Sequence, residues 1–157
     1  MFVAAAILAV SLGQSPAVIE EKAPGRPMVT CPAGTRPAGG KDGEAEAAYC
    51  TKAGRLGEPV MHGPFLSASK SGAKRVEGEY VDGKRTGRWI AYDELGRKVE
   101  DVGFQNDLWH GKRTQWIAGE KVLEQNWVAG KRQGPQKEWI KGREVTVEFK
   151  DDAPIKK

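Results

Sequence analysis

The chain has 157 residues, of which 39% are hydrophobic and 29% charged, which is enough for one modest domain and too little for two independent cores. Its 20 glycines and 5 tryptophans favour strands joined by tight turns over a leucine-rich helical bundle. The formal net charge is +4, with 25 basic and 21 acidic side chains mixed along the sequence. So mild a basic excess does not indicate a nucleic-acid-binding protein, and we expect no nucleic-acid partner.

An apolar run opens the chain, MFVAAAILAVSLG from Met1 to Gly13. It is shorter than the roughly 20 residues that span a bilayer as a helix, and its length fits the core of an export signal. Ser15 and Ala17 supply the small residues that a cleavage after Ala17 requires, although no Lys or Arg precedes the run. We therefore predict a signal peptide over residues 1–17 and a secreted, periplasmic or cell-envelope location. The alternative is a buried N-terminal segment of the fold.

The two cysteines, Cys31 and Cys50, support the same compartment, because an even pair in an exported protein is usually oxidised. They bracket a segment rich in Gly, Pro and Ala, and closing a loop of this size contributes roughly 3 kcal/mol of stability. A zinc site is disfavoured because there is no CxxC motif or histidine pair nearby. We predict a polar linker over residues 18–30 and a disulfide-closed loop region over residues 31–61. A lipid-modified Cys31 or two free thiols are the alternatives.

Glycines then recur at an almost constant spacing from His62 onward. The recurring glycines are followed at five residues by an aromatic side chain, and a second aromatic residue comes before the next glycine. Turn-forming residues stand three positions after each second aromatic. The four sets are Gly63, Gly87, Gly111 and Gly134; Tyr92, Trp116 and Trp139; Tyr80, Phe104, Trp127 and Phe149; and Gly83, Asp107, Gly130 and Asp152.

Within each unit the apolar residues alternate with polar ones. Val145, Val147 and Phe149 interleave with Glu144, Thr146 and Glu148, which is typical of a half-buried strand and would scatter around a helix. Glycines such as Gly96 lie between the two segments of a unit, where a turn needs positive φ. The sequence therefore predicts an all-β protein, an antiparallel β-meander of about four repeated hairpins over residues 62–150, followed by a tail over residues 151–157.

This pattern resembles the MORN (membrane occupation and recognition nexus) repeat, above all its bacterial variant. The residues that carry the resemblance are Tyr80, Gly83, Gly87, Trp89, Tyr92, Gly96, Phe104, Gly111, Trp116, Trp127, Gly130, Gly134 and Trp139. Departures from the pattern are Asp107 in place of a glycine, Leu108-Trp109-His110 in place of a basic linker, and Pro135. Bacterial proteins of this type are commonly described as antitoxins or immunity proteins of the YwqK family, and others are scaffolds or membrane-associated modules. The resemblance implies a partner-binding role.

Catalytic constellations are not indicated. The histidines, His62 and His110, lie two units apart, which is roughly 19 Å at about 4.8 Å per strand, so they cannot share a metal or a proton. Glu77 and Glu79 share a face, but alternation makes it the solvated one. No phosphate-binding glycine motif or nucleophile elbow occurs. We predict a non-enzymatic protein with no metal, cofactor or small-molecule substrate.

Basic pairs recur at or beside one kind of turn: Lys84-Arg85, Lys112-Arg113 and Lys131-Arg132. In a regular meander they would line up into a positive ridge suited to an acidic protein, an anionic lipid or an envelope polyanion. The alternative is that they solubilise the turns and protect strand edges. Trp109 lies in a turn where alternation does not require it, so it either caps the core or is an exposed binding anchor.

The sequence supports two functional hypotheses. The first is a module that binds a protein partner, either a toxin in an antitoxin- or immunity-like role or a protein of the envelope. The second is a structural or scaffold protein of the cell envelope, or a protein that binds an anionic membrane surface.

Overall fold

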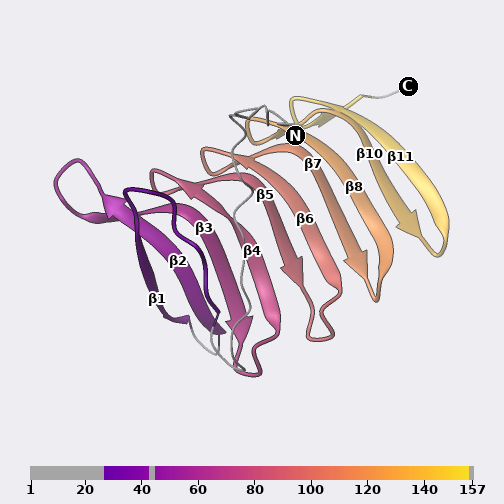
Figure 1. The fold of residues 1–157 in the computed structure, drawn as a ribbon. Coiled ribbons are helices and arrows are strands. Elements are labelled where there is room, and N and C mark those ends of the chain that lie inside the picture. Colours follow the sequence, from indigo (N-terminus) through magenta and orange to yellow (C-terminus); the bar gives the residue numbers. More distant parts are fainter. Residues whose placement is uncertain (1–26, 43–44, 156–157) are drawn as a thin grey trace, which may run out of the picture.

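The computed structural model describes residues 27–42 and 45–155 as a single antiparallel sheet of 12 strands (Figure 1). The strands lie side by side in chain order, except that the short β9 pairs only with β8 and β10 takes the next place in the sheet. No helix forms within these described residues. The strands are β1 (Arg36–Asp42), β2 (Ala45–Ala53), β3 (Pro59–Ser69), β4 (Lys74–Val81), β5 (Lys84–Tyr92), β6 (Lys98–Gln105), β7 (Leu108–Ile117), β8 (Glu120–Val128), β9 (Lys131–Arg132), β10 (Gly134–Ile140), β11 (Arg143–Lys150) and β12 (Ala153–Pro154). The predicted all-β meander is confirmed.

The sheet begins earlier in the chain than the glycine pattern indicates. In place of the expected loop over residues 31–61, β1 and β2 form a hairpin, and β2 continues the sheet by pairing Tyr49 with Phe65 of β3. Gly39 explains how so plain a sequence can form a strand, because a Cβ there would lie 2.6 Å from the carbonyl oxygen of Ala47. The expected tail likewise contains β12. The predicted signal peptide and residues 18–26 of the linker lie outside the described residues.

Cys31 and Cys50 form the predicted disulfide, with their Cα atoms 5.5 Å apart. Cys50 is fully buried, and the ring of Pro32 packs so closely on Gly63 that an added Cβ would lie 2.9 Å from its Cδ atom. The bond thus fastens the segment before β1 onto β2 and β3, at the first end of the sheet. A bond of this kind fits an oxidising compartment.

The evenly spaced glycines mark places where neighbouring strands fall out of register. Gly63, Gly87 and Gly111 each lie in a bulge opposite the preceding strand, and Gly134 follows the break between β9 and β10. All four have positive φ, at 103°, 63°, 86° and 72°. Glycine adopts this conformation without the steric cost that other residues meet, so the spacing in the sequence reflects a recurring backbone requirement.

Tight turns join most hairpins, and both central residues of these turns have positive φ, as in type I′ turns. Glycine or a short Asp or Asn side chain therefore suits the second position. The predicted turn residues occupy this position: Gly83 (78°), Asp107 (68°), Gly130 (81°) and Asp152 (69°).

The core lies on one face of the sheet, here called the aromatic face. Trp89 is buried at its centre, with ring centroids 5.0 Å from Tyr80, 5.5 Å from Phe65 and 6.1 Å from Phe104. The indole lies over Gly78, where an added Cβ would be 2.2 Å from the ring. Its Nε1–H donates to backbone carbonyl oxygens, including that of Thr86 at 3.2 Å, so the buried donor is satisfied.

Further along the sheet the same face becomes polar. Arg113 donates to Glu100 (2.8 Å) and Gln125 (3.0 Å), Gln125 donates to Gln136 (2.7 Å), and Gln136 donates to Glu138 (2.6 Å). Gln125 is buried, and this side-chain relay satisfies it. The strand alternation alone indicates an apolar face here, so the relay is a difference from that expectation.

The first prediction concerns Gly103, which faces the bulge at Gly111. An added Cβ would lie 2.0 Å from the carbonyl oxygen of His110, and a backbone atom cannot give way cheaply. Gly103→Ala is therefore expected to lower the free energy of unfolding by at least about 2 kcal/mol in urea titrations. Gly40→Ala is the matched control, because a Cβ there meets nothing within 4 Å. Equal stability of the two variants would contradict the close packing at this bulge.

Candidate functional site

The turns at one set of strand ends are tied to the neighbouring hairpin. We call this side of the sheet the clasp rim; it carries the turns at residues 82–83, 106–107, 129–130 and 151–152. In each, a turn N–H donates to a carbonyl oxygen near the start of an earlier strand. The four bonds are Gly83 to Met61 (2.8 Å), Asp107 to Arg85 (3.1 Å), Gly130 to Trp109 (2.8 Å) and Asp152 to Arg132 (3.2 Å).

Two of these clasps use an arginine. Asp107 Oδ1 accepts from the backbone N–H of Arg85 (3.0 Å) and from its Nε–H (3.1 Å), while the guanidinium carbon lies 4.1 Å from the ring centroid of Phe104. The backbone hydrogen bond is the main cause that lowers the pKa of Asp107. The same arrangement recurs at Arg132, Asp152 and Phe149, with the same 4.1 Å.

The other two clasps use the histidines. The backbone N–H of Asp82 donates to His62 Nδ1 at 3.2 Å, and that of Ala129 donates to His110 Nδ1 at 3.4 Å. Arginine and histidine clasps therefore alternate along the rim. Each histidine serves a different turn, and the described residues contain no group of three His, Cys, Asp or Glu side chains that could hold a metal ion.

Structural contacts occupy most of the predicted basic pairs. Arg85 and Arg132 belong to clasps, and Arg113 of β7 is half-buried between Glu100 and Gln125. Lys112 pairs with Glu124 at 3.2 Å and lies well inside β7, away from the turn. Of the six residues in these pairs, only Lys84 and Lys131 stand exposed beside clasp-rim turns, so the three pairs do not lie together as one ridge.

Trp109 is half-buried and packs within the sheet. Its ring centroid lies 4.5 Å from that of Trp127 at an interplanar angle of 76°, and the guanidinium carbon of Arg113 lies 4.5 Å from the ring. It also contacts the aromatic core around Trp89. These contacts fit the capping interpretation rather than the exposed anchor.

The opposite face, here called the carboxylate face, carries an acidic residue in every second strand of one cross-strand row. Glu77, Asp101 and Glu124 are joined in register through Ile90 and Thr114. Each of these carboxylates contacts two donor side chains: Glu77 contacts Lys74 and Tyr92, Asp101 contacts Arg88 and Lys98, and Glu124 contacts Lys112 and Lys121. These contacts neutralise the row from within.

These donors also govern the protonation of the three acids. Burial raises the pKa of Glu77, but the hydrogen bonds from Tyr92 and Lys74 outweigh it and the net shift is downward. The hydrogen bond from Arg88 is the main cause that lowers the pKa of Asp101, and that from Lys121 lowers the pKa of Glu124. All three are therefore carboxylates at neutral pH, suited to accept hydrogen bonds.

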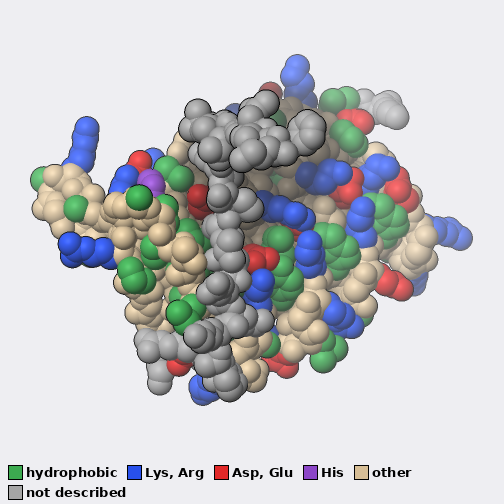
Figure 2. Space-filling view, in the orientation of Figure 1, with side chains coloured by type: hydrophobic (Ala, Val, Ile, Leu, Met, Phe, Trp, Pro, Cys, Tyr) green, Lys and Arg blue, Asp and Glu red, His purple; other side chains and the backbone are tan. Residues whose placement is uncertain are grey.

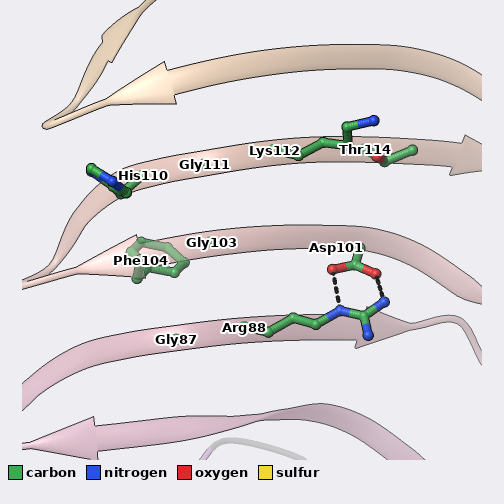
Figure 3. Close-up of a pocket in the computed structure, with 9 residues that line it drawn as sticks. All are labelled: Gly87, Arg88, Asp101, Gly103, Phe104, His110, Gly111, Lys112 and Thr114. Carbon is green, nitrogen blue, oxygen red and sulfur yellow. Dashed lines mark hydrogen bonds and ion pairs between the residues drawn. The ribbon is translucent and has the colours of Figure 1, made fainter.

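A shallow recess of about 510 Å³ opens beside this row, between β5, β6 and β7 (Figure 3). Three of the residues that line the recess are glycines without a side chain: Gly87, Gly103 and Gly111. Arg88 and Asp101 meet across it in a two-point ion pair, with Nε to Oδ1 at 2.8 Å. Arg88 and Asp101 satisfy each other, so neither presents an unpaired charge to the recess.

The other set of strand ends differs from the clasp rim. We call it the aliphatic rim; it carries the turns at residues 70–73, 93–97, 118–119 and 141–142. Large aliphatic side chains stand exposed at three successive turns: Leu95 (75% exposed), Ile117 (68%) and Ile140 (54%). The sequence interpretation missed these three residues. Each lies close to a turn glycine, and successive ones are 22 and 23 residues apart, a regularity that could have revealed them.

Basic side chains accompany this rim. Residues 70–75, 93–98, 117–121 and 140–144 hold 8 Lys and Arg against 4 Asp and Glu, a difference of +4. The matching stretches of the clasp rim, residues 81–85, 105–109, 128–132 and 150–154, hold 5 against 4. Figure 2 shows the wider picture on one side of the molecule, where basic and acidic side chains are interspersed. The basic excess is thus larger around the aliphatic rim, whereas exposed aliphatic side chains occur at both rims, since Val81, Leu108 and Val128 of the clasp rim are 41%, 49% and 50% exposed.

No protein-family model, no curated protein and no solved structure was found to match the chain. Within the described residues, no helix is long and apolar enough to span a bilayer.

The second prediction tests an arginine clasp through Asp107, which combines positive φ with two accepted hydrogen bonds. Asp107→Ala removes the acceptor and places a Cβ-bearing residue without a local hydrogen bond in the left-handed region, so we expect a loss of about 1 to 2 kcal/mol. Asp107→Asn keeps an acceptor oxygen and tolerates the conformation, and should lose less than Asp107→Ala. Chemical denaturation of the two variants checks this order, and the reverse order would contradict the clasp.

The third prediction concerns pH. The pKa values of Asp101, Asp107, Glu77 and Glu124 are lower in the folded protein, so the unfolded chain takes up protons first as the pH falls. Their stabilisation is complete above about pH 5, begins to fall near pH 4 as the carboxyl groups of the unfolded chain protonate, and is lost as the pH passes through the lower pKa values of the folded protein. Urea denaturation from pH 7 to pH 3 should show this, with a shallower fall for Asp101→Asn. A pH-independent midpoint would contradict the assigned carboxylate contacts.

Proposed function

We propose that this chain is an exported, non-catalytic binding module whose aliphatic rim docks on a protein partner. The observation that carries the proposal is the exposure of Leu95, Ile117 and Ile140 at three successive turns. Burying a large aliphatic side chain is worth about 1.5 to 3 kcal/mol, so water is a poor environment for three of them in a row. A surface that gains a protein partner removes this cost.

The spacing of the three residues suits a continuous interface. Successive tips are two strands apart, which is roughly 10 Å in a sheet, so the row extends over about 20 Å. This is comparable with the width of a standard protein–protein interface. The partner side should provide apolar pockets with an acidic border, because basic residues exceed acidic ones by four around these turns.

Export is part of the proposal. The disulfide between Cys31 and Cys50 fits a secreted, periplasmic or cell-envelope location, and the apolar opening of the sequence fits a signal peptide. The MORN-like pattern of glycines and aromatic residues supports a binding role of the antitoxin or immunity kind, with a toxin or an envelope protein as the partner. An anionic membrane surface is the second candidate, favoured by the same combination of aliphatic tips and basic side chains.

The fourth prediction tests the rim by comparing two variants. Leu95→Ser/Ile117→Ser/Ile140→Ser removes the exposed aliphatic side chains, and Val81→Ser/Val128→Ser is the matched control, because these valines are exposed at the clasp rim. In crosslinking and pull-down from the secreted and envelope fractions, the rim variant should retain less than about one tenth of the specifically captured protein. The control variant should retain nearly all of it.

Three outcomes separate the alternatives. Equal capture by the rim variant and the wild type contradicts the rim as the binding surface. Flotation with phosphatidylglycerol vesicles, lost in the rim variant and without any captured protein, favours the membrane candidate. Sedimentation that shows concentration-dependent self-association through the rim favours the scaffold alternative.

A further inference from the structure

The last long strand of the sheet has one open side. β11 pairs with β10 from Arg143 to Phe149, but on its outer side β12 meets only Phe149 and Lys150. The backbone N–H of Ile155 donates a hydrogen bond to the carbonyl oxygen of Glu148 at 2.8 Å. On this outer side, residues 143–147 have no pairing strand among the described residues, and all five are exposed.

This open side has the composition of a strand that pairs readily. Val145, Thr146 and Val147 are consecutive β-branched residues, and the two valines are 45% and 37% exposed on the aromatic face. The strand at the other end of the sheet is different, because β1 contains Pro37, Gly39 and Gly40. Proline and glycine weaken strand pairing and protect an edge, so the sheet is guarded at β1 and open at β11.

We propose that the outer edge of β11 binds an extended segment of a protein partner as an added antiparallel or parallel strand. The segment would alternate aliphatic side chains, which pack beside Val145 and Val147, with basic side chains, which face Glu144 and Glu148. This inference rests on the proposed function only in that the partner is a protein. Main-chain hydrogen bonds supply affinity in this mode, and the side-chain pattern supplies specificity.

Charge favours a foreign segment over a second copy of β11. Antiparallel self-pairing that sets Val145 opposite Val147 also sets Glu144 opposite Glu148 twice, and like charges directly opposite are destabilising. The register centred on Val145 sets Arg143 against Val147, which replaces an apolar contact with a charged side chain. A segment with lysine at the positions beside the glutamates avoids both the repulsion between glutamates and the contact of an arginine with a valine. Of these two glutamates, only Glu144 already forms an ion pair among the described residues, with Lys137 of β10 at 2.8 Å.

The position of β11 is also continuous with the proposed interface. Ile140 of the aliphatic rim lies one hairpin turn away and pairs with Arg143 at the start of β11. A partner that contacts the rim at Ile140 is therefore next to the strand edge that its extended segment would occupy.

The fifth prediction uses a capped heptapeptide of alternating valine and lysine as the probe, added to the full oxidised chain. Backbone NMR should show shifts and at least tenfold slower amide exchange confined to residues 143–147. Peptides N-methylated on one or the other alternating set of residues provide the control, because only one set directs its N–H groups at β11. One of the two should lose binding at least tenfold, and the other should bind as the unmodified peptide does.

Protein variants complete the test. Val145→Lys/Val147→Lys should weaken the valine–lysine peptide at least tenfold, and Glu144→Lys/Glu148→Lys should transfer binding to a valine–glutamate peptide. The rim variant Leu95→Ser/Ile117→Ser/Ile140→Ser should bind the peptide like the wild type, so failure of the rim and failure of the edge are distinguishable. Three results would overturn the proposal: equal binding of both methylated peptides and the unmodified peptide, chemical shift changes outside β11, or dimerisation through residues 143–147.

Discussion

The turn-to-strand hydrogen bond at the clasp rim is the contact on which the shape of the sheet depends. A hairpin joined by a two-residue turn is held to its own partner strand, but its tip is otherwise free to splay. Here four tips donate a backbone N–H to an earlier strand, at 2.8 to 3.2 Å. Histidine and arginine side chains reinforce them in alternation, which ties each hairpin to the one before it.

This use of one rim for structure leaves the other rim available. At the clasp rim, Arg85 and Arg132 are held by aspartates and by aromatic rings. At the aliphatic rim, Leu95, Ile117 and Ile140 extend into water, and the contacts that Asp93 makes with Leu95 and Arg97 stay within a single turn. The two rims of one sheet therefore differ in how their turns are held, and the proposed binding surface is the rim opposite the clasps.

Much of the fold could be predicted because glycine and aromatic positions report on the backbone directly. Gly63, Gly87, Gly111 and Gly134 have positive φ at bulges or at a strand break, and such a requirement shows in sequence as an even spacing. The hairpin of β1 and β2 could not be found this way, since Gly39 is needed for close approach to Ala47 and small residues conceal the alternation. The disulfide was predictable from the cysteine count and the predicted export signal.

The site was less predictable, because side-chain roles depend on partners that lie 11 to 22 residues away. Arg85 is an ordinary basic residue in the sequence, and only the fold brings Asp107 and Phe104 to it. Gln125 likewise interrupts an apolar pattern and finds its partners only across strands, in Arg113 and Gln136. A pattern of charges along the chain therefore indicated a ridge that the three-dimensional contacts do not form.

Amide hydrogen exchange measures the clasps most directly. The account predicts that the backbone amides of Gly83, Asp107, Gly130 and Asp152 exchange about as slowly as those within the strands, since each donates across to an earlier strand. The amides of Ala118 and Lys141, in type I′ turns of the aliphatic rim, should exchange rapidly. Equal, rapid exchange at both rims would contradict the clasps as the contacts that hold the sheet together.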